Sequence, residues 1–513
     1  MSRPSIIVVD QGTSSTKGFL FNESLKELHT DKIRHTVNRP RRGWVECDAD
    51  EIFNACHTVM EQMAVEANTR SLTVAAVGMA FQRSTFLFWG KDDGKPQAPA
   101  MSWQDSRATG LVKNLSSESA DIQRRTGIPL TGHFGGPKYL HSLREDNAIK
   151  RGIENGEFFF GSLSSFVTHR LTGSNTMDQS IAGRSLMMNI SALDWDDHLL
   201  KLFEIKENCL PSIVPTCHNF GTVSIGKSEV PLLCVMGDQQ ASLIGQGRRE
   251  KGDVAMNFGT SGSVLVNCGK EPVVVPSLLS NVLFSSKDSI HFLLEGTINS
   301  VASLFKWLEG YLGITHDDMN WESRCSGEQD GIMVPGLNGI SAPYWTGEFE
   351  TQFFGLDQKS EPNKVVRAAM ESIGFLVYDI CNVIEKEAKI ELVDMVASGG
   401  SSRAPLLQFI ADITGTNVST TAAKDMTALG VARLVANSAF GTPLDSGPER
   451  LEQFRPGMAP ELRDKKISAW RNALRKLSIL EQRRYVNANT GRCLALALQI
   501  YRIRFSETTW AGR

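Results

Sequence analysis

The stretch that decides the fold of this chain is Val8-Val9-Asp10-Gln11-Gly12-Thr13-Ser14-Ser15-Thr16-Lys17-Gly18-Phe19-Leu20-Phe21. Two apolar runs enclose a short polar segment, which predicts a tight β-hairpin with a hydroxyl-rich tip. Glycine lets the backbone approach an anion closely, and Thr and Ser hydroxyls with neighbouring N–H groups can surround phosphate oxygens. The stretch is therefore a candidate phosphate-binding hairpin, although Gly-Thr-Ser also occurs in ordinary turns.

The same pattern returns in the second half as Ala255-Met256-Asn257-Phe258-Gly259-Thr260-Ser261-Gly262-Ser263-Val264-Leu265-Val266. Both copies place Asp or Asn, one further residue and Gly-Thr-Ser between apolar runs. Two copies near the starts of two halves predict paired phosphate clamps. Lys17 is the obvious cation of the first copy, but Val264 holds the corresponding place in the second. The prediction of phosphate binding therefore rests on the Gly-Thr-Ser tip that both copies share.

Length and composition indicate a two-domain globular protein. A chain of 513 residues is too long to form one compact core. Its content of 41% hydrophobic and 22% charged residues is typical of soluble proteins. The formal charge of -3 gives no reason to expect nucleic acid as a partner. No apolar run approaches the roughly 20 residues of a membrane span. The first residues of the chain contain too few apolar side chains for the core of a signal peptide. The nine scattered cysteines favour reduced thiols and a cytoplasmic location.

A carboxylate follows a buried strand in Pro231-Leu232-Leu233-Cys234-Val235-Met236-Gly237-Asp238-Gln239-Gln240-Ala241. Asp238 is therefore expected at the carboxyl end of a strand and near the N-terminus of a helix. A carboxylate there is suited to accept a proton or to approach a metal ion. The alternative is a purely structural helix N-cap.

Polar and aromatic residues also follow other expected strands of the first half. Arg83 comes after a strand at 72–80, Trp103 and Asp105 lie in a polar segment at 101–107, and His133 lies in a glycine-rich loop. Such strand ends are where α/β folds place ligand contacts. The alternatives are an ordinary ion pair between Arg83 and Asp105, and a water-exposed loop histidine.

The second half continues to alternate strands and helices. A strand is expected at 290–294, followed by Glu295-Gly296-Thr297. Another at 392–397 leads into Gly399-Gly400-Ser401 and a helix at 405–414, an order suited to a nucleotide platform although a lone Gly-Gly pair is weak support. The small residues at 428–439 predict a closely packed structural helix.

Together these motifs resemble those of the FGGY family of carbohydrate kinases, from about Ile6 to about Leu480. Several stretches look like those of glycerol kinases within that family. They are Asp10-Gln11-Gly12-Thr13, Gly43-Trp44-Val45-Glu46, Gln82-Arg83, Trp103-Gln104-Asp105, Gly237-Asp238-Gln239-Gln240-Ala241, Ala342-Pro343-Tyr344-Trp345 and Glu371-Ser372-Ile373.

The resemblance implies an α/β fold of two actin-like, ribonuclease H-like ATPase domains that close over a central cleft. Residues 1–247 would form the substrate-side domain with the first hairpin and Asp238, and residues 248–482 the nucleotide-side domain. Residues 483–513 would form a C-terminal extension, to which we assign no role. A homodimer is kept as one option for the assembly.

The resemblance also implies roles for individual residues, in agreement with the needs of phosphoryl transfer. Asp238 would be the general base and, with Asp10, a contact for Mg²⁺. ATP contacts are implied at Gly12, Thr13, Ser14, Lys17, Gly259, Thr260, Gly399, Gly400 and Ser401. Substrate contacts are implied at Arg83, Ser84, Trp103, Asp105, His133 and Gln239.

The expected function is ATP- and Mg²⁺-dependent phosphorylation of a hydroxyl group of a small sugar or polyol. Ser84, His133 and Ser263 stand where glycerol kinases carry Glu, Tyr and Phe, which predicts a wider, more polar pocket for a longer polyol or a xylulose-like ketose. A glycerol kinase proper is the alternative. A second alternative is an actin-like nucleotide switch or a sugar sensor without turnover, which would not require Arg83, Trp103 and Asp105.

Overall fold

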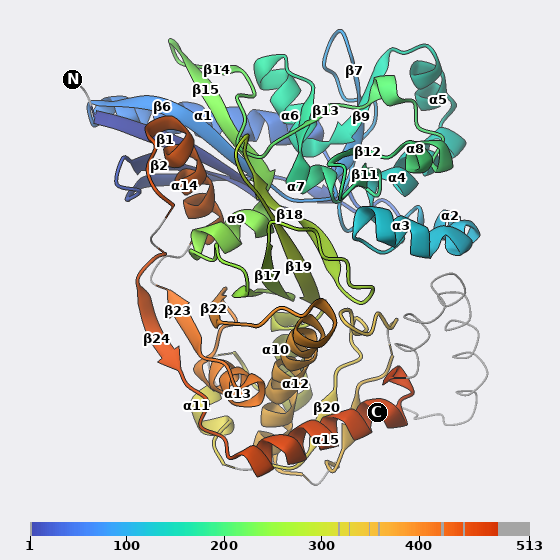
Figure 1. Ribbon diagram of the computed structural model, residues 1–513, viewed down its shortest axis with the longest axis vertical. Helices are drawn as coiled ribbons and strands as arrows, with labels where there is room; N and C mark the ends of the chain where they lie inside the picture. The colour runs from blue at the N-terminus through green and yellow to red at the C-terminus, as the bar shows by residue number, and fades with distance from the viewer. Residues whose placement is uncertain are drawn as a thin grey trace.

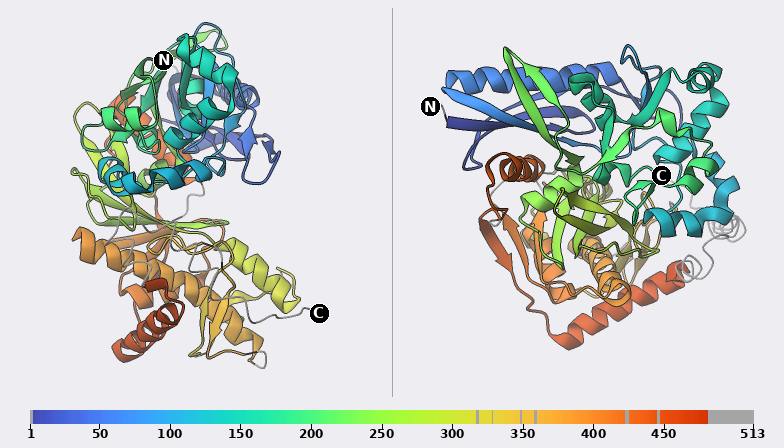
Figure 2. Two further views of the ribbon diagram at one scale, coloured as in Figure 1. Left: turned by 90° about the vertical axis from the view of Figure 1, so that its right-hand side faces the viewer. Right: turned by 45° about the horizontal axis from the view of Figure 1, so that its top comes forward.

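The computed structural model describes residues 3–316, 319–327, 329–347, 349–357, 360–421, 425–444 and 447–480. The extension expected at 483–513 lies outside these residues. The described chain forms two α/β lobes, each built around one large mixed sheet, and Figures 1 and 2 show one lobe above the other. The predicted two-domain α/β architecture is confirmed.

The sheet of the first lobe brings three strand ends to one edge. Its order is β14-β15-β6-β1-β2-β3, with β1 and β2 forming the predicted first hairpin. Because β1, β6 and β15 run parallel, their carboxyl ends lie at the same edge of the sheet. Asp10 lies near the end of β1, Arg83 follows β6, and Asp238 follows β15. The strand bounds are β1 (Arg3–Gln11), β2 (Ser15–Asn22), β3 (Glu27–Arg34), β6 (Leu72–Phe81), β14 (Thr222–Ile225) and β15 (Ser228–Gly237).

Helix α1 (Ala49–Thr69) covers one face of this sheet. The side chain of Asp48 caps it by accepting from the N–H groups of Asp50 and Glu51. Its buried residues Ile52, Cys56, Val59 and Met63 recur at three-to-four spacing and therefore share the face that packs on the sheet.

The rest of the first lobe is a smaller subdomain, which carries the loops of Trp103 and His133. Its five-stranded sheet has the order β4-β5-β8-β7-β9. The strands are β4 (Val37–Asn38), β5 (Glu46–Cys47), β7 (Phe86–Gly90), β8 (Ala100–Met101), β9 (Phe158–Ser162), β10 (Thr176–Asp178), β11 (Met188–Asn189), β12 (Asp194–Trp195) and β13 (Ser212–Val214). The helices are α2 (Thr109–Val112), η1 (Lys113–Glu118), α3 (Ser119–Thr126), α4 (Gly135–Glu145), α5 (Asn147–Glu154), α6 (Leu163–Thr172), α7 (Gln179–Ala182), α8 (Asp197–Leu202) and η2 (Glu207–Cys209).

The sheet of the second lobe contains the second predicted hairpin, formed by antiparallel β16 and β17. Its order is β18-β19-β17-β16-β22-β23-β24. Strand β19 continues past the expected end at Leu294, so Glu295 and Thr297 lie within it. The bounds are β16 (Asp253–Phe258), β17 (Gly262–Gly269), β18 (Leu279–Ser285), β19 (Ile290–Ile298), β22 (Asp394–Ser398), β23 (Val418–Thr421) and β24 (Arg450–Phe454).

Helices pack on this second sheet around the long, largely buried α12. The expected helix at 405–414 is confirmed as α13, which ends at Gly415 in the left-handed conformation. The remaining elements are α10 (Ala302–Leu312), α11 (Trp321–Arg324), β20 (Ile332–Val334), β21 (Gln352–Phe354), α12 (Pro362–Val383), the π-helical turn η3 (Ile384–Ala388), α13 (Ala404–Thr414) and α15 (Pro460–Lys476). Over the described residues, no helix has both the length and the apolar character needed to cross a membrane.

Helix α14 (Met426–Phe440) crosses back and packs on the first lobe, although its residues fall in the range expected for the second domain. Figure 1 shows its red-brown ribbon beside the blue strands β1 and β2. Its small residues let it meet α9 (Asp238–Gly245) backbone to backbone, as the sequence predicts. A Cβ on Gly430 would lie 1.9 Å from the carbonyl oxygen of Ala241, and one on Gly245 would lie 1.9 Å from that of Met426.

A side chain at Gly430 should force α9 and α14 apart. We expect Gly430→Val to lower the free energy of unfolding by about 3 kcal/mol, the size of a severe overpacking. Gly310→Ala in α10 is the matched control, since a Cβ there meets nothing within 4 Å, and it should stabilise by about 0.5–1 kcal/mol. Urea unfolding measures both, and equal effects of the two variants would contradict the close contact.

Candidate active site

Three charged groups meet where the parallel strands of the first lobe end. Asp10 is the penultimate residue of β1, Arg83 follows β6, and Asp238 follows β15 as the first residue of α9. The Nε atom of Arg83 lies 3.6 Å from Oδ1 of Asp238, whose side chain is 26% exposed. The N-cap of α9 is Gly237, so the structural N-cap alternative for Asp238 is wrong. The arrangement leaves an accessible carboxylate beside a helix N-terminus and an arginine.

The two carboxylates at this edge repel each other. Burial, with a further contribution from Asp238, raises the pKa of Asp10 to about 7. Burial also raises the pKa of Asp238, although Arg83 opposes the shift. A cation between them would relieve this repulsion. Mg²⁺ fits such a site because it is commonly bound through one or two carboxylates, with water and phosphate oxygens as its other ligands.

The tip of the first hairpin is joined to the substrate-side loop. The N–H of Gly12 donates to the carbonyl of Ser15 at 2.9 Å, which closes the turn. The indole Nε1–H of Trp103 donates to the hydroxyl of Thr13 at 2.9 Å. Because an indole nitrogen only donates, the Thr13 hydroxyl accepts this bond and keeps its own hydrogen for another acceptor. Ser14, beside it, is exposed.

Lys17 lies in β2, opposite Asp10 of β1, and pairs with Asp425, the residue before α14. The structure thus gives the lysine of the first hairpin a protein partner. The contact ties the hairpin to the start of the helix that crosses between the lobes.

The two expected ATP-contact segments of the second half lie in adjoining loops. The Ser401 N–H donates to the carbonyl of Phe258 at 2.9 Å, and its hydroxyl donates to that of Gly259 at 3.4 Å. Gly399 has φ of +98°, and a Cβ there would lie 2.4 Å from the Phe258 oxygen. Only glycine fits this approach. Gly399, Gly400 and Ser401 therefore sit against the tip that carries Gly259 and Thr260.

Buried Lys138 fixes two substrate-side loops from beneath. Its ammonium donates to the carbonyls of Ser84 at 2.8 Å, Ser102 at 2.7 Å and Met101 at 3.2 Å. Ser84 has φ of +62° and is 7% exposed, so its unusual backbone conformation is held by this contact. Burial lowers the pKa of Lys138 to about 7.

His133 packs beside Trp103. Its Nδ1 lies 3.2 Å from the Trp103 carbonyl oxygen, which can only accept, so Nδ1 carries the proton and Nε2 is left as an acceptor. Burial lowers the pKa of His133 and keeps the ring neutral. His133 is thus partly buried in its loop, where Nε2 can accept a hydrogen bond.

Asp105 has no exposed surface, and both of its oxygens are bound within the protein. It accepts from the Val45 N–H at 2.7 Å and from the guanidinium of Arg107, which also reaches Glu46. The alternative of an ion pair between Arg83 and Asp105 is wrong. Asp105 instead supports the loop that carries Trp103.

Sequence reasoning missed Glu295, Arg184 and Lys138. Glu295 binds both Arg83 and Arg184 from the opposite lobe. One signal was present, because Glu295 interrupts the apolar run Phe292-Leu293-Leu294, and a charge within a buried strand requires a partner. Nothing in the sequence identifies that partner.

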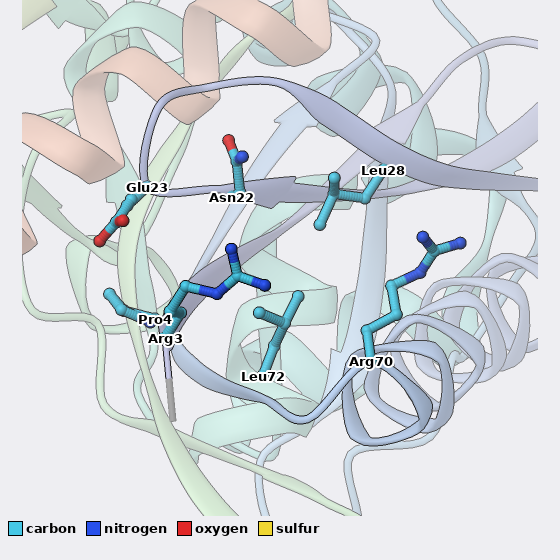
Figure 3. Close-up of a pocket in the computed structure, with 7 residues that line it drawn as sticks. All are labelled: Arg3, Pro4, Asn22, Glu23, Leu28, Arg70 and Leu72. Carbon is cyan, nitrogen blue, oxygen red and sulfur yellow. The ribbon is translucent and has the colours of Figure 1, made fainter. Parts of the chain in front are cut away.

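A surface cavity of about 270 Å³ lies elsewhere on the first lobe. Figure 3 shows Arg3, Asn22, Arg70 and Leu72 among its lining residues. Arg3 and Leu72 begin β1 and β6, whereas Asp10 and Arg83 lie at the other ends of these strands. The cavity is thus at the opposite edge of the sheet from the carboxylates.

Most of the chain matches two domains of one known protein family. Residues 5–245 match the N-terminal domain of the FGGY family of carbohydrate kinases, and residues 254–439 match its C-terminal domain. The chain is 32% identical to glycerol kinase 1 of Thermotoga maritima over 492 residues, which cover 92% of this chain and 99% of that protein.

Two solved structures share the architecture. A glycerol kinase of Plasmodium falciparum with ADP is 28% identical, with a TM-score of 0.87 over 93% of this chain and 98% of that one. A ligand-bound xylulose kinase of Lactobacillus acidophilus is 22% identical, with a TM-score of 0.82 over 95% of this chain and 99% of that one. The second similarity supports the fold alone.

Removing the ammonium of Lys138 should loosen both loops that it holds. We expect Lys138→Met to lower the free energy of unfolding by about 3 kcal/mol, because buried carbonyls lose their donor. Lys150→Met, at an exposed lysine of α5, should be close to neutral. Thermal and urea unfolding measure both variants, and a neutral Lys138→Met would contradict the role.

The pH dependence of stability in the wild type and in Lys138→Met tests the lowered pKa of Lys138. The folded protein releases the Lys138 proton near pH 7, whereas an unfolded lysine keeps it to about pH 10. The unfolded chain therefore binds more protons between these values, and raising the pH favours the folded state. The stability of the wild type relative to Lys138→Met should rise from pH 7 to pH 9, and a flat or falling difference would contradict the lowered pKa.

Proposed function

Because this chain belongs to the FGGY family of carbohydrate kinases, we propose that it transfers the γ-phosphoryl group of ATP to a hydroxyl group of glycerol or another short linear polyol. Membership makes the chain an ATP-dependent phosphotransferase with an alcohol acceptor. The observation that carries the proposal is the meeting of Asp238 and Arg83 at the strand ends, between two hydroxyl-bearing hairpins.

The glycerol alternative is better supported than the xylulose-like expectation. A second relative, the glycerol kinase of Staphylococcus epidermidis, is 30% identical over 93% of this chain. The expected wider pocket relied on Ser84 and Ser263, yet each is only 7% exposed. The Ser263 hydroxyl also donates to the side-chain oxygen of Gln239 at 3.2 Å, across the two lobes. Serines that are buried and bonded in this way argue for a small acceptor.

We assign the proton transfer to Asp238. The substrate oxygen bonds to the γ-phosphorus, the bond from that phosphorus to the bridging oxygen of ADP breaks, and the hydroxyl proton passes to the Asp238 carboxylate. Arg83, beside Asp238, would orient the acceptor hydroxyls. Asp10 and Asp238 would hold Mg²⁺, which when bound neutralises negative charge on the phosphates.

The phosphates would lie between the two hairpins. Thr13 of the first lobe and Thr260 of the second have hydroxyls near the two tips, and Gly12 and Gly259 leave room for close approach. Donors placed in advance cost little reorganisation when charge shifts during transfer. Trp103 orients the Thr13 hydroxyl, so that its hydrogen can point to the γ-phosphate.

Asp238→Asn should abolish turnover and leave nucleotide binding intact. With glycerol, erythritol, xylitol and xylulose as acceptors and coupled ADP detection, the variant should lose about 10²–10⁴-fold in kcat. The wild type should use glycerol or the shorter polyols best. ATP affinity by calorimetry should change little.

Asp92→Asn, at an exposed turn of the first lobe, is the matched control and should keep full activity. Equal activity of Asp238→Asn and the wild type would remove Asp238 from the base role. ATP binding by the wild type with no binding or turnover of any acceptor would instead favour a nucleotide switch.

The bond between Trp103 and Thr13 can be tested with a double-mutant cycle. Trp103→Phe keeps an aromatic ring and removes the N–H donor, and Thr13→Val removes the hydroxyl. Each should lower kcat about 3- to 10-fold, the equivalent of one hydrogen bond of about 1 kcal/mol. Trp103→Phe should add little in the Thr13→Val background.

Trp195→Phe serves as the control, because that indole donates to the carbonyl of Pro211 instead of to a hairpin. It should leave kcat unchanged. Fully additive effects of Trp103→Phe and Thr13→Val would show that the indole does not act through Thr13.

A further inference from the structure

Glu295 is a buried carboxylate of the second lobe whose partners are two arginines of the first lobe. Its Oε2 accepts from Nη1 of Arg83 at 2.7 Å, and its Oε1 accepts from Nη2 at 3.0 Å, in a bidentate pair. Oε2 also accepts from Arg184. The side chains of Glu295 and Arg184 are 2% and 4% exposed. These three residues, which we call the arginine clamp, join the lobes beside Asp238.

Strand register explains why Glu295 points toward the first lobe. Glu295 pairs with Leu265 across β17 and β19, and it shares a face of β19 with Leu293. Leu265 and Leu293 belong to one core cluster with Leu243 and Ile244 of α9. This face of the sheet therefore packs toward the helix that begins at Asp238. The bond from Ser263 to Gln239 crosses between the lobes in the same region.

The charges of the clamp depend on one another. Burial alone would raise the pKa of Glu295, but Arg184 and Arg83 lower it to about 2, so it stays ionised. Burial disfavours a charged Arg83, yet Glu295 outweighs this effect and the pKa of Arg83 is raised. Loss of the carboxylate would leave two buried guanidinium groups facing each other, with Asp238 as the carboxylate nearest to Arg83.

The clamp leaves part of Arg83 free to bind a substrate. A guanidinium carries five N–H groups in one plane, and the pair with Glu295 uses one on each terminal nitrogen. Nε faces Asp238, and one N–H on each terminal nitrogen remains. The bidentate pair fixes the plane of the group, so these donors are held beside the catalytic carboxylate.

We infer that Glu295 is a positioning residue of the second lobe, which holds Arg83 in the orientation that receives the polyol. The inference rests on the proposed function, because it assigns the acceptor to Arg83. Since Glu295 and Arg83 come from different lobes, the polyol site is complete only while the lobes are in contact. The nucleotide contacts at Gly259 and Gly399 do not involve the clamp.

Glu295→Gln separates positioning from a merely structural role. The amide keeps the size of the side chain and removes its charge. We expect the KM for the best acceptor in the wild-type panel to rise about 10- to 100-fold, the range for a hydrogen bond to a charged group. The affinity for ATP alone, measured by calorimetry, should change less than about twofold. Glu309→Gln, at a carboxylate of the same lobe that pairs with His316, should leave both unchanged.

Glu295→Asp retains the charge on a shorter side chain and keeps the test usable if Glu295→Gln does not fold. If both variants fold, the KM of Glu295→Asp for the acceptor should lie between the values of the wild type and Glu295→Gln. If only Glu295→Asp folds, its KM for the acceptor should rise above that of the wild type while its affinity for ATP stays constant. An unchanged acceptor KM in a folded variant overturns the inference, as does a parallel loss of acceptor and ATP binding.

A measurement without turnover distinguishes this inference from the proposed function. If the wild type phosphorylates none of the acceptors, the proposed function fails. Contact between the lobes can still be followed by small-angle X-ray scattering. Glu295→Gln should increase the radius of gyration relative to the wild type and Glu309→Gln. Identical radii would overturn the statement that the arginine clamp joins the lobes.

Discussion

The backbone-to-backbone contact of α9 and α14 at Gly245 and Gly430 joins the second half of the chain to the first lobe. It lets a helix from the second half of the chain lie on the first sheet, and it fixes the helix that begins at Asp238. Asp425, just before α14, then meets Lys17 of the first hairpin. One close helix contact thereby sets Asp238, the first hairpin and the crossing between the lobes in fixed relation.

The carboxylates Asp10, Asp238 and Glu295 lie in different environments. Asp10 and Asp238 remain partly exposed with raised pKa values, as expected where a cation and a substrate hydroxyl are to be bound. Glu295 is buried, ionised and neutralised by Arg83 and Arg184. Acid groups of the same chemistry thus differ in charge and exposure according to burial and partner, which suits the proton transfer proposed for Asp238 and the positioning inferred for Glu295.

Local patterns in the sequence were enough to predict the two hairpins, at 8–21 and 255–266, and the small-residue helix that became α14, because hydrophobic periodicity and glycine placement are local properties. Contacts between distant segments were not predictable in this way. The partners of Glu295 and Asp105 depend on how separate strands and loops meet. The pocket width inferred from Ser263 did not take account of such a contact, because the Ser263 hydroxyl is bonded to Gln239 of the other lobe.

Transfer of the γ-phosphoryl group from ATP to a short polyol can be established by identifying the product. ³¹P nuclear magnetic resonance can follow the wild-type protein with ATP, Mg²⁺ and glycerol. We expect the γ-phosphate signal to be replaced by the signals of a phosphomonoester and of ADP. Release of ADP with inorganic phosphate as the only other product would contradict it.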